Sequence, residues 1–140
     1  MKKILVLILG VLTLALAACS AGAPSSSAPQ QITVESSEFK FEPAMIEAAS
    51  GRSVKMALRN KGTIEHDWAI MKIPMTGKKE SSMGGHDMSS MSNEPELHMN
   101  AAVGKTAQVE FTPTQPGTYQ IFCTAAGHKE AGMVGTLVVK

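Results

Sequence analysis

The stretch of sequence that decides the fold is Thr118 to Val139, which reads TYQIFCTAAGHKEAGMVGTLVV. Its first five residues alternate between polar and apolar side chains, and its last six are rich in strand-forming residues, so both ends predict β-strands. The loop between them carries Cys123, His128 and Met133, with four residues in each interval. Two glycines allow this loop to fold tightly, and the three side chains are therefore expected to lie close together.

Further short strands precede this stretch. Alternating or apolar runs, most of them ended by proline or glycine, predict strands at Ile32–Glu35, Phe39–Phe41, Val54–Asn60, Trp68–Ile73 and Gln108–Phe111, with a shorter segment from Ile46. No segment has the periodicity of an amphipathic helix. The pattern predicts an all-β Greek-key barrel or sandwich of seven to eight strands. Strand signals vanish at about 75–103, where we expect a flexible insert rich in Met and His.

The loop residues and one distant histidine, His66, predict a metal site. Two imidazoles, one thiolate and a weak axial thioether form the trigonal copper site of electron-transfer proteins. Taken singly, Cys123 is explained as a small core residue and Met133 as packing. Their regular spacing with His128 after a strand favours one mononuclear copper ion instead. Zinc is the weaker competitor because Met is not a customary zinc ligand.

The same residues resemble a known family. The segment from Pro116 to Cys123, together with Gly132 to Leu137, resembles the cupredoxins, or small blue copper proteins, and the likeness extends over about residues 31–140. The ligand loop is similar to those of azurin, auracyanin and plastocyanin. The resemblance implies a Greek-key β-barrel with copper near one end. It also implies that the ring edge of His128 is the exposed route for electrons, whereas His66 is more enclosed.

Three residues depart from the pattern of the family. Glu65 replaces the Gly that offers a carbonyl ligand in azurins, so that fifth ligand is not carried over. Ala126 replaces a Pro, which adds one backbone N–H near the sulfur and would tune the reduction potential. Asp67 stands where the family usually has Asn. It either bonds the loop backbone near Thr124 or is a solvated acid, and the sequence leaves both readings open.

The predicted insert suggests a second function. Five of the ten Met and two of the four His lie between residues 75 and 99, among Gly, Ser and charged residues rather than in an apolar stripe. Soft thioethers suit Cu(I), and His suits Cu(II). We therefore expect a second, weaker and labile copper-binding segment formed by Met83, His86, Met88, Met91, His98 and Met99. The alternative is an oxidation-tolerant disordered loop.

The N-terminus is predicted to direct export and lipidation. Residues 1–18 combine two lysines with an apolar run too short to span a membrane, as in a signal peptide. The small residues before Cys19 resemble a lipobox, although ordinary cleavage beside an incidental Cys is an alternative. Residues 19–31 would then be a lipidated, flexible linker before a copper-binding domain at 32–140. Lipidation of Cys19 leaves Cys123 as the only thiol, so no intramolecular disulfide is expected.

These observations predict a function. We expect a membrane-anchored one-electron carrier on the periplasmic or cell-surface side, not an enzyme, because protein ligands fill every copper position. A redox partner would dock near His128, where small apolar residues gather: Ala125, Ala126, Ala131 and Val134. We expect a monomer that binds no nucleic acid, since the formal net charge is only +1. The alternative is an extracytoplasmic copper storage or delivery protein that uses the insert.

Overall fold

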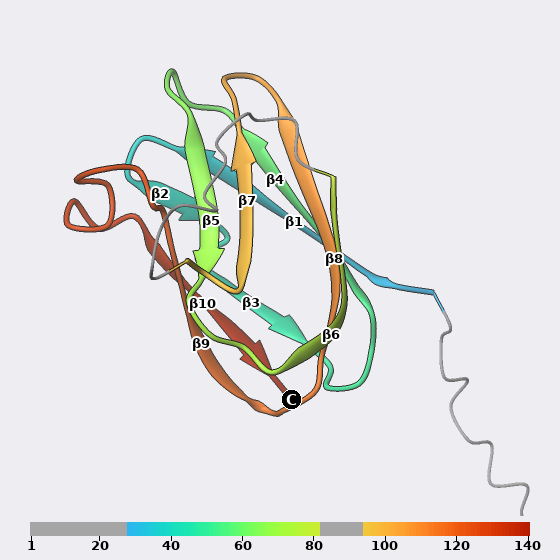
Figure 1. Cartoon of the computed structure of the whole chain (residues 1–140). Coiled ribbons are helices and arrows are strands. Elements are labelled where there is room, and N and C mark those ends of the chain that lie inside the picture. The colour runs from blue at the N-terminus through green and yellow to red at the C-terminus, as the bar shows by residue number, and fades with distance from the viewer. Residues whose placement is uncertain (1–27, 82–93) are drawn as a thin grey trace, which may run out of the picture.

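The protein is an all-β sandwich over the residues that the structure describes, which are 28–81 and 94–140 of this computed structural model (Figure 1). The strands are β1 (Gln30–Ser37), β2 (Lys40–Glu42), β3 (Met45–Ala48), β4 (Val54–Asn60), β5 (His66–Ile70), β6 (Met75–Ser81), β7 (Leu97–Ala101), β8 (Thr106–Pro113), β9 (Gly117–Phe122) and β10 (Val134–Val139). Within those two ranges, no helix is long and apolar enough to cross a membrane.

The strands form two five-stranded sheets that face each other. One sheet has the order β2-β1-β4-β8-β6, and the other has the order β3-β10-β9-β5-β7. The pairs β1–β4 and β3–β10 are parallel, whereas the remaining pairs are antiparallel. The all-β Greek-key prediction is confirmed, with ten strands in place of the seven or eight expected.

The core lies between the two sheets and follows from the alternation of the strands. In β4, Val54, Met56 and Leu58 point inward and are fully buried, while the side chains between them are more exposed. The hydrophobic effect stabilises this arrangement by about 25 cal/mol for each Å² of apolar surface buried. Trp68 of β5 is among the largest fully buried side chains. The core therefore anchors β5, the strand that begins with His66, firmly against the opposite sheet.

The predicted insert is shorter than expected, because two strands lie within it. β6 pairs with β8, and β7 pairs with β5 along its whole length. The sequence of β6 concealed a strand because it lies at a sheet edge, where residues 76–79 are exposed, and because its register shifts between Thr76 and Lys79. Residues 82–93 of the predicted flexible insert lie outside the described residues.

Three connections come together at one end of the sandwich. The loop between β9 and β10, the loop before β5 and the turn between β1 and β2 lie at this end, away from the C-terminus (Figure 1). Three of the predicted ligands lie in the β9–β10 loop, and His66 is the first residue of β5, directly after the second connection. The fold therefore gathers residues that lie more than fifty positions apart in the sequence.

Candidate copper site

His66 is held by the loop that precedes it. The side chain of Asn60 donates hydrogen bonds to the carbonyl oxygens of Ile64, at 2.7 Å, and Ala101, at 2.8 Å, and it accepts one from the N–H of Gly62, at 2.8 Å. Ala101 is the β7 partner of His66. The imidazole is 0% exposed, and neither of its nitrogens has a hydrogen-bond partner. Two buried, unpartnered nitrogens are costly unless a metal takes one of them.

The other three predicted ligands are brought together by hydrogen bonds within the β9–β10 loop. The N–H of Cys123 donates to the carbonyl of Met133 at 3.1 Å, and the N–H of Met133 donates to the carbonyl of His128 at 2.9 Å. A third bond, from the N–H of His128 to the carbonyl of Ala125 at 3.1 Å, closes the turn. Gly127 and Gly132 adopt φ angles of 80° and 99°, which other residues rarely reach. The four-residue spacing thus becomes a closed loop.

The loop and β5 bring their donor atoms into one cluster. The ligand atoms of His66, Cys123 and His128 all lie within 4.8 Å of one another. His128 Nδ1 is 3.4 Å from Cys123 Sγ, and the two imidazole centroids are 5.2 Å apart. Met133 is fully buried in the same loop. A thiolate, two imidazoles and a thioether fit copper, so the predicted His66, Cys123, His128 and Met133 form a type 1 copper site.

Burial controls the protonation of the ligands. Burial raises the pKa of the Cys123 thiol, and the negative charge of Asp67 raises it further. The backbone N–H groups of Asp67 and Ala125 lower this pKa and offset part of the rise. The thiol is therefore protonated at neutral pH and must release its proton to bind metal. Burial, followed by the charge of His128, lowers the pKa of His66. That imidazole is therefore neutral near pH 7, the form in which histidine binds metals.

Asp67 joins the two ligand segments instead of facing solvent. Its backbone N–H lies 3.4 Å from Cys123 Sγ, and its carboxylate accepts hydrogen bonds from the Thr124 hydroxyl and, at 2.5 Å, from Asn100 Nδ2. His98 Nε2 is 3.5 Å away. Burial alone would raise the pKa of Asp67, but its contacts with His98, Thr124 and Asn100 outweigh burial and lower it. The bond to Thr124 goes to its side chain, not to the backbone as expected.

One feature expected of the loop is corrected. The N–H groups that contact the thiol belong to Asp67 and Ala125. The replacement of Pro by Ala at position 126 was expected to supply such an N–H, but Ala126 is not among the groups that act on the thiol. The sulfur is thus contacted from β5 and from the start of the loop.

The proposed second copper set is divided by the structure. Met99 is 1% exposed and packs in the core opposite Trp68, so its inclusion in a labile, exposed copper segment is wrong. His98 lies on the same strand and contacts Asp67. Packing in the core explains Met99, whereas a copper-binding role of His98 stays a prediction. Met83, His86, Met88 and Met91 lie outside the described residues, as does Cys19.

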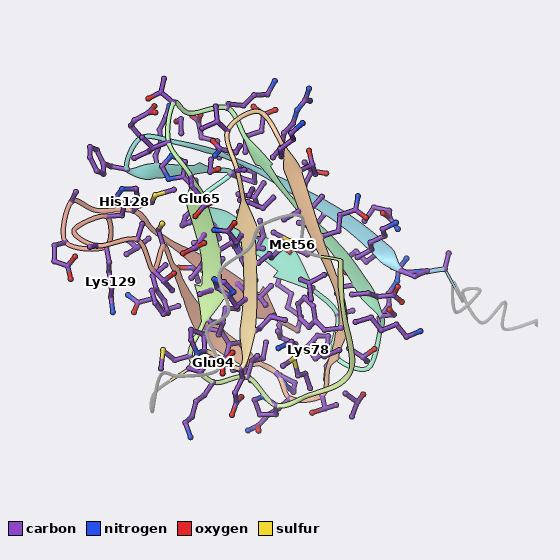
Figure 2. All side chains as sticks on the ribbon, turned by 45° about the horizontal axis from the view of Figure 1, so that its top comes forward. Met56, Glu65, Lys78, Glu94, His128 and Lys129 are labelled. Carbon is purple, nitrogen blue, oxygen red and sulfur yellow. The ribbon has the colours of Figure 1, made fainter. Side chains whose placement is uncertain are left out.

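The outer side of the copper site is covered by residues that the sequence pattern did not single out. His128 is 8% exposed, the most of the four ligands, and His66 is fully enclosed, as the resemblance implied. Figure 2 shows His128 on the outer loop at this end, with Lys129 beside it pointing outward. Phe39, which is 46% exposed, meets the His128 ring edge to face, and Ile64 of the preceding loop is 44% exposed. No local motif reveals the contact of Phe39 with His128, because it joins two distant segments.

A β-sandwich with two His, a Cys and a Met at one end defines a small blue copper protein. The chain belongs to the cupredoxins, since the family model of the cupredoxin-like domain matches residues 6–139. It is 30% identical to the copper-resistant cuproprotein CopI of Rubrivivax gelatinosus, over 85% of this chain and 73% of the relative. It is also 27% identical to a plastocyanin of Prochlorothrix hollandica, over 99% of this chain and 88% of the relative.

Solved structures show the same fold. Auracyanin from Roseiflexus castenholzii superposes with a TM-score of 0.61 at 20% identity, covering 81% of this chain and 98% of that chain. A multicopper oxidase also matches, with a TM-score of 0.58 at 13% identity, but only 45% of that chain is covered. At these identities the likeness concerns the fold alone.

Proposed function

We propose that the protein carries single electrons between extracytoplasmic redox partners. The observation that supports this most directly is that all four ligands are buried and come from the protein, which leaves no open position for a substrate. Bound copper supplies a couple between Cu(I) and Cu(II). The closed loop of hydrogen bonds holds Cys123, His128 and Met133 in fixed positions, and burial excludes water. A fixed, dry ligand set keeps rearrangement small when the charge changes by one.

Electrons would enter and leave through His128, because it is the most exposed of the four ligands. We propose that a redox partner docks on the surrounding surface. This surface would comprise Phe39 and Ile64 together with the four residues expected from the sequence, of which Ala125 is partly buried: Ala125, Ala126, Ala131 and Val134. Exposed apolar side chains are suited to a brief contact with a partner protein. The protein would act as a monomer and have no nucleic-acid partner.

The same ligand set supports a carrier rather than an enzyme. Copper enzymes need an open coordination position for a substrate. The likeness to a multicopper oxidase covers less than half of that chain and shows the fold alone. Of the two remaining histidines, His98 contacts Asp67, and His86 lies outside the described residues. The carrier reading therefore remains the stronger proposal.

The anchoring of the protein remains a proposal from its sequence. Cleavage before Cys19 followed by acylation would attach the domain to a membrane through residues 19–31. Substituting Cys19→Ala tests this in cells. We expect the wild-type chain in the membrane fraction and the variant in the soluble extracytoplasmic fraction. Equal distribution of the two would exclude a lipid anchor at this residue.

Copper storage or delivery is the second candidate. It is favoured by the 30% identity to a copper-resistant cuproprotein. The Met and His residues at 83–91 would be its working part, and the deletion of these residues tests it. We expect the full chain to bind more Cu(I) than the deletion variant. If both bind the same amount, the segment has no role in copper capture.

Voltammetry and metal transfer distinguish the two functions. A carrier gives a reversible one-electron couple and keeps its copper when mixed with a metal-free acceptor protein. A delivery protein loses copper to the acceptor. Cys123→Ser serves as the control, because it removes the thiolate and should abolish the couple. Rapid loss of copper from the wild-type protein would overturn the carrier proposal.

A further inference from the structure

The turn between β1 and β2 places an aromatic ring on one copper ligand. Phe39 has a φ of 61°, in the left-handed region that few residues other than glycine adopt. Its ring lies 5.3 Å from the His128 ring, centroid to centroid, with an angle of 81° between the planes. This edge-to-face geometry is favourable for aromatic pairs. A strained backbone and a half-exposed phenyl ring both cost folding free energy. Such strain is typical of residues that serve a functional site.

Glu38, the residue before Phe39, places its carboxylate beside the loop that leads to His66. Glu38 Oε1 accepts hydrogen bonds from the N–H of Thr63 at 2.5 Å and from its hydroxyl at 2.8 Å. These bonds, with the backbone of Thr63 as the largest cause, lower the pKa of Glu38 to about 2. The carboxylate is therefore charged under all ordinary conditions. Thr63 lies in the loop that leads to His66, so Glu38 ties the turn to that loop.

Gly62 shows how closely Glu38 approaches His66. A Cβ at position 62 would lie 2.8 Å from His66 Nε2 and 2.9 Å from Glu38 Oε1. Both distances are shorter than van der Waals contact allows. The imidazole and the carboxylate therefore both reach the space that a Cβ of residue 62 would occupy, and only glycine leaves that space free.

We infer that Glu38 and Phe39 are positioning residues that hold the two histidine ligands and slow the loss of copper. Phe39 covers the His128 ring, and Glu38 fastens the turn over the Gly62–Thr63 segment next to His66. The inference depends on the copper site but not on electron transfer to any partner. It therefore stands or falls separately from the proposed carrier function.

Release of Cu(I) to bathocuproine disulfonate from the full chain, purified in mild detergent, tests this inference. Phe39→Gly is the most informative variant because glycine adopts the native φ without strain. The substitution therefore removes the ring without straining the backbone. An aromatic contact of this kind corresponds to release that is about three- to tenfold faster. Glu38→Ala should also accelerate release. Phe39→Tyr should restore the wild-type rate.

Two controls separate positioning from a loss of stability. Lys40→Ala changes an exposed residue of the same hairpin, whose partner is Glu42, and should release copper at the wild-type rate. Urea unfolding of the metal-free variants should show Phe39→Gly to be no less stable than the wild type. Wild-type release from Phe39→Gly or Glu38→Ala overturns the role of that residue. If faster copper release is accompanied by a matching loss of unfolding free energy in the metal-free variant, the residue has a structural role and the positioning role is overturned.

Discussion

Replacing Asp67 by Ala should destabilise the protein because it removes the acceptor that joins two ligand segments. Thr124 and Asn100 both donate to this carboxylate, and each would lose its partner in a site that is largely buried. A buried donor left without an acceptor costs about 1–3 kcal/mol, so Asp67→Ala should lower the free energy of unfolding by about 2–4 kcal/mol. Urea denaturation of the metal-free protein at pH 7 measures this difference.

Asp67→Asn is the matched control for that substitution. Its amide oxygen can still accept from Thr124, and its amide nitrogen can donate to Asn100 Oδ1, which is buried without a partner, once the Asn100 amide turns over. We expect a loss below about 1 kcal/mol. If Asp67→Asn were as damaging as Asp67→Ala, or if Asp67→Ala matched the wild type, the role of this carboxylate as a shared acceptor would be refuted.

Acid adds a second readout for the same residue. The pKa of Asp67 is lowered in the folded protein, so the unfolded chain binds the proton first as the pH falls. The stability that Asp67 contributes is complete above the ordinary pKa of 3.8 and is lost as the pH falls below that value toward the folded pKa. The Asn variant should lack this part of the acid dependence. An unchanged acid profile would contradict the assignment.

Further predictions concern the core and the ligand segment. Met99→Ala should lower the free energy of unfolding by about 2–5 kcal/mol and leave copper stoichiometry unchanged, whereas a loss of bound copper would make Met99 a ligand after all. Asn60→Ala removes three hydrogen bonds beside His66 and should lower the free energy of unfolding in urea by about 2–4 kcal/mol. An unchanged free energy of unfolding would show that other contacts hold this loop. The metal-free protein should lose stability as the pH falls below 6.5, because the unfolded chain binds a proton that folded His66 resists. His66→Gln should weaken that slope, and an equal slope would assign it to another group.

The ligand loop could be predicted from sequence because its information is local. Cys123, His128 and Met133 share one loop between two strongly patterned strands, and His66 precedes the strand that contains Trp68. Spacing and residue type were sufficient there, because thiolate, imidazole and thioether together suit few ions other than copper. Most core strands could be predicted for the same reason, because apolar and polar residues alternate within each strand according to the face of the sheet that they occupy.

The remaining features depend on contacts between distant segments. β6 was missed because an exposed edge strand carries little hydrophobic alternation, and β7 was missed because it lies beside a polar, Met-rich stretch. Met99 looked like a metal ligand by composition, yet its strand packs it against the core. Glu38 and Phe39 reach the histidines only through the turn between β1 and β2. No pattern within a single segment predicts such contacts.

The most direct measurement is to add one equivalent of Cu(II) to the metal-free chain and record its visible and electron paramagnetic resonance spectra. We expect one copper per chain, an intense thiolate-to-copper absorption band and narrow hyperfine splitting, all of which Cys123→Ser abolishes while the fold remains. A colourless protein whose Cys123 still reacts with an alkylating reagent after copper addition would contradict the assignment of this site.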